Sequence, residues 1–469
     1  MTRHTTLAFT HPIVIALTSM IVTSASVATG QQPSPPVSAA LTIDQAIRQA
    51  LDRYPVVQEQ RARARAAEEG IAVARTAYLP RVDLVWQENR ATHNNVFGLL
   101  FPQSTVPAVS GPVLSRSSDS VWGSAAGALI SWDAVDFGQR KAAIDAARAQ
   151  QAAASARTAQ SELDSAAAAA DAFVTVLAAD ASVRAARANV DRLEVFANAV
   201  RTLVTNQLRP GVDQSRAEAE LANARNQLTQ AQQNAEIARA TLGEAVGQAG
   251  SAIDVVPGRL STVPSAAVGP RGVEMHPAAR AAAASIDVVR ARERALERST
   301  LPRIALQSAV SARGSGAVLA GIDASDGLWP NVPNWAAGVS VTFPFVDLFS
   351  VRPRQRVEAQ NEVAERAHYQ QTVADVTTQQ VRAAALYKAA AAIAQNMMAV
   401  LTAAQETEQR ARARYDNALA SITEVAEAQH LLAQAETDDA VARLGVWRAL
   451  LAQAQAAGDL TPFLTMAAP

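Results

Sequence analysis

The chain has 469 residues, of which 49% are hydrophobic but only 4% are aromatic, so bulky side chains that fill a compact globular core are scarce. Alanine-rich sequence of this kind favours long helices packed at close range. A formal net charge of −1 gives no support to nucleic-acid binding, and without cysteine we expect neither disulfides nor a lipoprotein anchor.

The N-terminus predicts an export signal. A basic residue precedes a mostly apolar stretch from Ile13 to Val22, and small residues for cleavage follow. This stretch is shorter than the roughly 18–20 residues that a membrane-spanning helix needs. We expect a signal peptide at 1–28, cut after Ala28 or Gly30, and a proline-rich leader at 29–40. After the leader we expect no transmembrane helix.

The segment after the leader predicts a helix followed by two strands. Pro80 ends the helical pattern, and apolar and polar residues then alternate from Val82 to Gln87, which indicates a strand. A loop rich in Asn, Pro, Ser and Gly separates it from a second strand. We expect a helix at 43–78, strands at 81–90 and 120–132, and a loop at 93–118.

A very long helix is predicted next. From Gln139 to Arg209 there are 71 residues without glycine or proline. At 1.5 Å per residue, this length suffices for a helix of about 100 Å. Small apolar residues recur every seven positions from Val176 to Val204, as in a coiled-coil seam. Pro210-Gly211 turns the chain, so we expect a long helix at 139–209 and a returning helix at 212–243.

The rest of the chain repeats this order. Tyr54-Pro55 recurs as His276-Pro277, 222 positions later, and Asp136 recurs as Asp347, 211 positions later. Composition alone would not hold such residues at a fixed offset, so we expect two equivalent units. The units span 41–250 and 273–460, with a linker at 251–272 and a C-terminal tail at 461–469. Within the second unit we expect a helix at 277–300, strands at 303–313 and 334–344, a long helix at 354–416 and a helix at 422–457.

Residue patterns for catalysis or cofactor binding are missing from the sequence. The six histidines are scattered without metal-ligand spacing, and no phosphate-binding glycine motif precedes a helix. Single acidic residues on long helices are far more often solvated than catalytic. We therefore expect no enzyme, no cofactor and no metal site.

The four strands fit a membrane barrel. Alternating strands of about 9–13 residues are long enough to cross an outer membrane once. Four strands cannot close a barrel alone, so several chains would have to combine. The alternative is a small periplasmic sheet with ordinary aromatics at its edges. In a barrel, the aromatics near the strand ends would form an interfacial girdle, namely Trp86, Trp122, Trp132, Trp335 and Phe343.

Four segments, in this order and spacing, carry a family resemblance. They are Leu41 to Ile47 before Tyr54-Pro55, Ala77 to Pro80, Ser131 to Arg140, and Arg209 to Leu221. Over essentially all of the mature sequence, the chain resembles the outer-membrane efflux proteins of the TolC family. The resemblance implies a mainly α fold with a transmembrane β-barrel. It also implies a homotrimer, whose twelve-stranded barrel continues into a long α-helical periplasmic tunnel.

The same resemblance implies a transport function. Proteins of this kind are passive channels in the cell outer membrane, and they serve tripartite efflux pumps or type I secretion systems. The implied partners are a periplasmic adaptor (membrane fusion) protein, an inner-membrane pump and outer-membrane lipid, with no nucleic acid. We therefore expect a conduit that exports small molecules, as in multidrug efflux, to the exterior.

The resemblance also assigns residues to the periplasmic entrance. Glu424 and Glu427 match acidic positions that ring this constriction, and Asp213 matches Glu424 in the first unit. Tyr415 matches a tyrosine that latches the closed entrance by hydrogen bonds, but Ala420 stands where the family carries an arginine of that latch. The alternative for the two glutamates is an ordinary solvent-facing role.

Two other functions compete with a channel. A periplasmic adaptor would have one helical hairpin, a lipoyl-like β-domain and an anchor, whereas this sequence predicts two hairpins and has no cysteine. A structural coiled-coil protein of the periplasm, without a pore, would leave the four alternating strands without a purpose. We therefore favour the channel.

Overall fold

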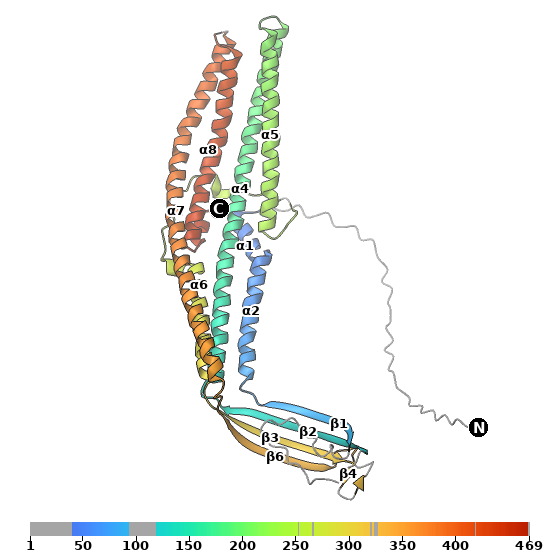
Figure 1. Ribbon diagram of the computed structural model, residues 1–469. Coiled ribbons are helices and arrows are strands. Elements are labelled where there is room, and N and C mark those ends of the chain that lie inside the picture. The colour runs from blue at the N-terminus through green and yellow to red at the C-terminus, as the bar shows by residue number, and fades with distance from the viewer. Residues whose placement is uncertain are drawn as a thin grey trace, which may run out of the picture. The chain divides into compact units, whose positions relative to one another are not determined.

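The computed structural model describes residues 40–92, 119–251, 253–264, 267–318, 321–322, 327–417 and 419–467. These residues all belong to one compact unit, Ala40–Pro469. The unit is mostly helical and has a small antiparallel sheet (Figure 1). The predicted signal peptide, the leader up to residue 39 and the loop at 93–118 lie outside the described residues.

The first helical segment is two helices rather than the single helix predicted at 43–78. Helix α1 spans Ile43–Arg53 and α2 spans Pro55–Thr76. Tyr54 separates them in an extended conformation, with ψ of 124°, because a residue that precedes proline is disfavoured in the helical region. Thr42 and Gln45 form a capping box at the start of α1.

The first unit continues through two strands and two helices. They are β1 (Arg81–Thr92), β2 (Ser120–Val135), α4 (Gln139–Thr205) and α5 (Gly211–Ala245). The prediction placed the end of α4 at 209, four residues too late. Gln207 has a φ of +59°, a left-handed conformation that an α-helix cannot continue through.

The second unit has the same element order. It comprises α6 (Pro277–Ser299), β3 (Arg303–Ser315), β6 (Val332–Thr342), α7 (Leu348–Asp416) and α8 (Ile422–Ala456). Short elements lie between and after them: η1 (Gly258–Ser261), η2 (Val273–Met275), β4 (Ala317–Val318), β5 (Gly321–Ile322) and α9 (Thr461–Ala467).

Several bounds in this unit differ from the prediction, most of all at α7 and β6, and the tail also differs. Helix α7 begins at Leu348 rather than 354 and contains Pro353. Pro353 is the sixth residue of α7, so its missing N–H removes one bond that would otherwise run to the carbonyl of Phe349. Strand β6 ends at Thr342, so Phe343 lies just beyond it. The predicted tail at 461–469 contains the helix α9.

The sheet joins strands from both units in the order β1-β2-β3-β6, and every pairing is antiparallel. Helix α4 packs against α2, α5, α6 and α8, and α7 packs against α6 and α8. One hydrophobic cluster lies around Phe173, Trp447 and Phe463. A second cluster, around Phe196, Tyr415 and Val425, lies at the ends of the two helical hairpins.

Two helices are long and apolar enough to cross a membrane by length and composition alone, a property that core helices of soluble proteins share. They are α4 and α7, each with an apolar 18-residue window. In α4, 56% of that window is buried, as in the core helix of a soluble protein. In α7 only 6% of the window is buried, so this part of α7 lies open in a single chain.

Candidate functional site

The two faces of the four-stranded sheet differ: one is mostly apolar, and the other carries most of the polar side chains among small and apolar ones. Residues opposite each other in antiparallel strands share a face, and Trp132, Leu306 and Val339 form one such row. Large apolar side chains exposed on this face are Val82, Leu84, Trp86, Ile130, Trp132, Leu306, Val310, Trp335, Val339 and Val341. The opposite face carries Arg81, Asp83, Gln87, Ser131, Asp133, Gln307, Ser311, Arg313, Asn334, Ser340 and Thr342.

The predicted girdle aromatics fall into two groups. Trp86, Trp132 and Trp335 are exposed on the apolar face, and Phe343 is exposed just beyond β6. Trp132 Nε1 donates a hydrogen bond of 2.9 Å to the carbonyl of Tyr78, which ties β2 to the end of α2. Trp122 is instead half-buried under the guanidinium of Arg90, 5.5 Å from its ring centre.

Trp329 is a further aromatic residue of this surface that was not among the predicted girdle residues. Its ring meets that of Trp86 edge to face at a centroid distance of 6.0 Å. Because the two residues are far apart in the sequence, only the folded sheet brings them together. Trp329 and Trp86 are both exposed, so this pair extends the aromatic surface of the apolar face.

The joint between β2 and α4 is held by a nearly buried ion pair. Asp136 accepts hydrogen bonds from the backbone of Gly138 and Arg140, and the Arg140 side chain donates to it at 2.7 Å. The Arg140 guanidinium also lies 4.6 Å from the Tyr78 ring centre. Burial acts to raise the pKa of Asp136, but the hydrogen bonds from Arg140 and Gly138 outweigh it and lower that pKa.

Tyr415 connects the ends of the two helical hairpins. Its side chain is buried, and its hydroxyl donates to Asp213 Oδ2 at 3.5 Å. Phe196 packs edge to face against its ring at 5.5 Å. The Arg209 guanidinium lies 4.3 Å from the centre of the same ring, and it donates a hydrogen bond of 2.7 Å to the Tyr415 carbonyl. Burial, followed by the charge of Asp213, raises the pKa of Tyr415.

The predicted acidic residues do not form one cluster. Asp213 is buried against Tyr415, whereas Glu424 is exposed at the start of α8. Glu424 forms a capping box with Ser421, and its Oε2 lies 3.5 Å from Arg414. Glu427, one turn along α8, is exposed. Arg209 and Arg414 are partners that the sequence analysis missed, although each stands next to a predicted turn.

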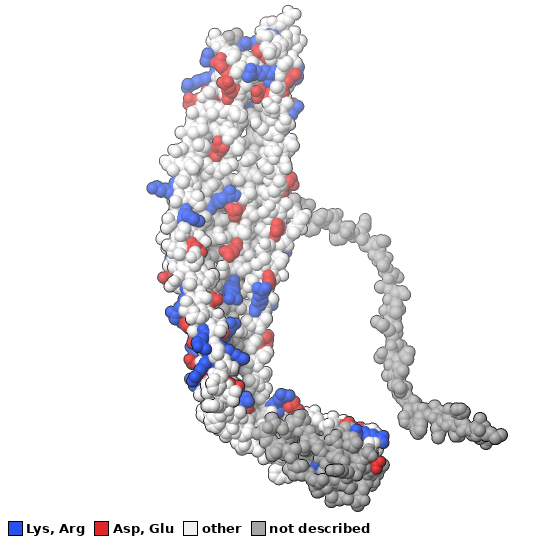
Figure 2. Space-filling model, in the orientation of Figure 1, with Lys and Arg blue, Asp and Glu red and all other residues white. Residues whose placement is uncertain are grey.

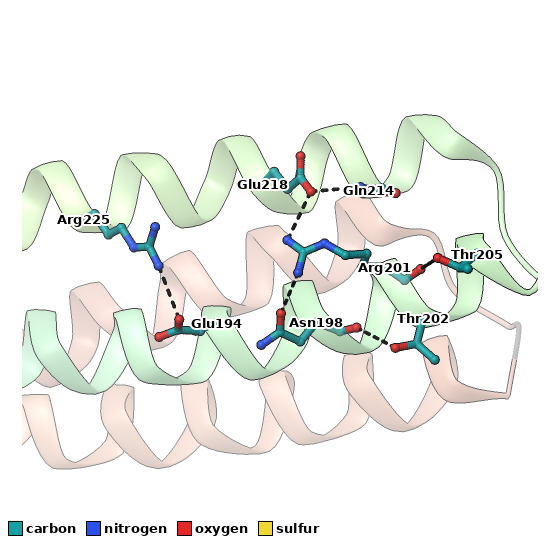
Figure 3. A network of polar contacts seen from close by, with 8 residues as sticks. All are labelled: Glu194, Asn198, Arg201, Thr202, Thr205, Gln214, Glu218 and Arg225. Atoms are coloured by element: carbon teal, nitrogen blue, oxygen red, sulfur yellow. Dashed lines mark hydrogen bonds and ion pairs between the residues drawn. The ribbon is translucent and has the colours of Figure 1, made fainter.

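Polar contacts join α4 to α5 near the first hairpin turn (Figure 3). Arg201 pairs with Glu218 at 3.2 Å, and Arg225 pairs with Glu194 at 3.4 Å. Hydrogen bonds from Gln214 and Arg201 lower the pKa of Glu218. The four charged side chains of these pairs are exposed, so each pair contributes little to stability. Among the described residues, no cluster of three or more acidic or histidine side chains could hold a metal ion.

Comparisons with known proteins agree with this architecture. The family model of the outer membrane efflux proteins matches residues 46–248. A comparison with curated proteins gives no match. The solved outer-membrane channel OprN is 20% identical, with a TM-score of 0.68 over 89% of each chain. The open state of the Neisseria gonorrhoeae outer membrane channel MtrE is 19% identical, with a TM-score of 0.70 over 89% of each chain.

A further solved structure is similar in fold. CusC is 15% identical, with a TM-score of 0.72 over 92% of this chain and 96% of that chain. At these identities the structural matches establish the fold. Together with the family model, they confirm the predicted resemblance to outer-membrane efflux channels.

Proposed function

We propose that this chain, which resembles the outer-membrane efflux proteins, is the channel component of a tripartite efflux pump or a type I secretion system. Three copies would form a passive conduit in the outer membrane. The conduit would export small molecules that it receives from an inner-membrane pump through a periplasmic adaptor. The observation that carries this proposal is the sheet, which has a mostly apolar face and, among the described residues, two unpaired edges.

The apolar face of the sheet favours contact with lipid. Its exposed Trp, Val, Leu and Ile side chains form a continuous surface across all four strands. Soluble proteins rarely leave such a surface open to water. The polar residues on the other face, Asp83 and Gln307 among them, suit a water-filled lumen.

The edges of the sheet favour assembly. Within the described residues, β1 and β6 each have a neighbour on one side only. In a membrane every backbone N–H and C=O group needs a partner, so β6 of one copy would pair with β1 of the next. Three copies of four strands then give the twelve-stranded barrel that the resemblance implies. The exposed apolar window of α7 would be covered between neighbouring copies.

The hairpin ends would form the periplasmic entrance. In this proposal Tyr415, Asp213 and Arg209 hold the second hairpin against the first and so restrict the opening. Glu424 and Glu427, exposed near the second turn, would place six carboxylates around a threefold axis. Such a ring favours cations over anions.

The size and conductance of the purified protein test the proposal. We expect the detergent-solubilised protein to have the mass of a trimer and to open ion-conducting pores in planar bilayers. Membranes washed at alkaline pH should retain it, because an inserted barrel resists a wash that strips peripheral proteins. A monomer without conductance would instead support the structural coiled-coil protein.

The acidic entrance can be tested separately. Changing Glu424→Gln and Glu427→Gln together should reduce the cation selectivity of the pore, because it removes six charges from the proposed ring. A matched control is Glu68→Gln with Glu69→Gln, which removes the same charge from exposed positions on α2. If both double variants keep the wild-type reversal potential under a salt gradient, the entrance assignment is wrong.

A further inference from the structure

The joint between β6 and α7 carries an exposed surface that combines aromatic and basic side chains. We call it the β6–α7 collar. It contains Phe343, Phe345, Val346, Phe349, Arg352 and Arg356. We propose that the collar binds the anionic headgroups of phospholipids at the bilayer surface that faces the helices. This inference rests on the proposed function, which places the sheet in a membrane.

The apolar part of the collar continues the apolar face of the sheet. Val339 and Val341 are exposed on that face of β6, and Phe343 follows them with the same alternation. Phe345, Val346 and Phe349 come next, and each is more than two-thirds exposed. Aromatic side chains at the end of a membrane strand are typical of the headgroup depth, where they are neither fully in lipid nor fully in water.

The basic side chains of the collar have no partner among the described residues. Arg352 and Arg356 are exposed, and neither forms a hydrogen bond or an ion pair with any described residue. Phe349, Arg352 and Arg356 stand at positions i, i+3 and i+7, so they share one face of α7. The ten residues from Leu348 to Val357 contain three arginines and no carboxylate. Lys and Arg side chains are visible on the helices close to the sheet in Figure 2.

The equivalent joint of the first unit lacks this character. At the offset of 211, Lys141 stands where Arg352 is, and Asp145, which pairs with Arg148 at 2.9 Å, stands where Arg356 is, so only Lys141 remains without a carboxylate partner on this face. Arg140, at the position of the buried Val351, is held by Asp136. An uncompensated pair of cations is therefore particular to the second joint. It is not a general consequence of the duplicated fold.

The chemistry of the collar fits a phosphodiester at a lipid surface. A guanidinium can donate two parallel hydrogen bonds to phosphate oxygens, and an anionic bilayer surface attracts arginines within about 10 Å of it. The neighbouring phenylalanines would hold the arginines at the depth of the lipid headgroups. A zwitterionic lipid offers the same phosphate without the net charge, so the collar should prefer anionic lipid.

Spin-labelled lipids measure this preference on the intact protein. The full-length protein is reconstituted in phosphatidylcholine vesicles, and the immobilised fractions of spin-labelled phosphatidylglycerol and phosphatidylcholine are compared. We expect the wild type to prefer phosphatidylglycerol. In Arg352→Gln with Arg356→Gln, the preference should fall by about threefold to fivefold, towards equal association. Raising NaCl to about 1 M should remove most of the difference between the two proteins.

A matched control removes the same charge far from the sheet. Arg187 and Arg382 are also exposed and without a partner among the described residues. Arg382 lies about 39 Å further along α7 than Arg356, well beyond the screening length. Arg187→Gln with Arg382→Gln should therefore keep the wild-type lipid preference. An equal loss in both double variants would overturn the inference, because it would reflect net charge alone.

The remaining outcomes separate this inference from the proposed function. If the wild type conducts ions but shows no preference for phosphatidylglycerol, the collar assignment is wrong and the channel stands. If the collar variant no longer forms a trimer while its lipid preference persists, the collar is a contact between copies and the lipid assignment is wrong. A wild type that neither inserts nor conducts would overturn the channel and the collar together.

Discussion

The two strand–helix joints of the chain occupy equivalent positions in the two units, yet they use their charges differently. In the first joint Asp136 and Arg140 bond to each other with side chains only 13% and 11% exposed. In the second joint Asp347 is exposed, and its side chain makes no cap hydrogen bond to α7. The first joint is thus closed by contacts within the chain, whereas the second presents its charges outward. The two joints therefore share their order of elements but not their charge contacts.

The largest expected effect comes from breaking the closed joint. Asp136→Ala leaves Arg140 nearly buried without its carboxylate, and we expect a loss of about 2 kcal/mol of stability. Asp347→Ala is the matched change at the open joint, where no side-chain contact is lost. The thermal midpoint of the helical circular dichroism signal measures both variants. Equal losses in the two would show that the joints do not differ in the way described.

Acid should weaken the first joint. The pKa of Asp136 is lowered from 3.8, so its stabilising contribution is present above that pH and is lost as the pH falls through the lowered value. The difference in thermal midpoint between wild type and Asp136→Ala should therefore shrink below about pH 3.8. A difference that stays constant from pH 7 to pH 3 would contradict the assigned ion pair.

The smallest effect is expected where the two units meet. Tyr415→Phe removes one hydroxyl at 3.5 Å from Asp213 but keeps the ring contacts with Phe196 and Arg209. We expect a loss of about 0.5–1 kcal/mol in the same thermal measurement. Because the pKa of Tyr415 is raised from 10.0, the stabilisation that its hydroxyl supplies should persist at neutral pH and fall only above pH 10.0. Tyr369→Phe, on the same helix, is the control and should leave the midpoint unchanged.

Much of the fold could be predicted because its signals are local. Alternation located the strands to within three residues, and the absence of glycine and proline located the long helices. Predicted helix boundaries were wrong where a proline can either break a helix or lie within it. Pro55 splits a predicted helix, whereas Pro353 lies inside α7, and the sequence pattern does not distinguish a break from a tolerated early proline.

The candidate site was predictable in residue type but not in contacts. The resemblance singled out Tyr415 and Asp213, and the structure places them together. Arg209, 206 residues from Tyr415, was missed because only the packing of the two hairpins brings it to that ring. Asp213 and Glu424 match in the duplicated sequence, yet one is buried and the other is exposed. Equivalent sequence positions therefore do not ensure equivalent surroundings.

The pairing of β2 with β3 has a consequence for the order of folding. β3 and β6 can pair as a local hairpin, and β1 and β2 can pair across one loop. The central ladder, however, joins Val135 to Ile304 across the whole of α4, α5 and α6. Contacts between such distant segments form slowly, because the chain between them must first be brought into place. The two halves of the sheet should therefore form early and separately, and their pairing should limit the rate at which the complete sheet forms.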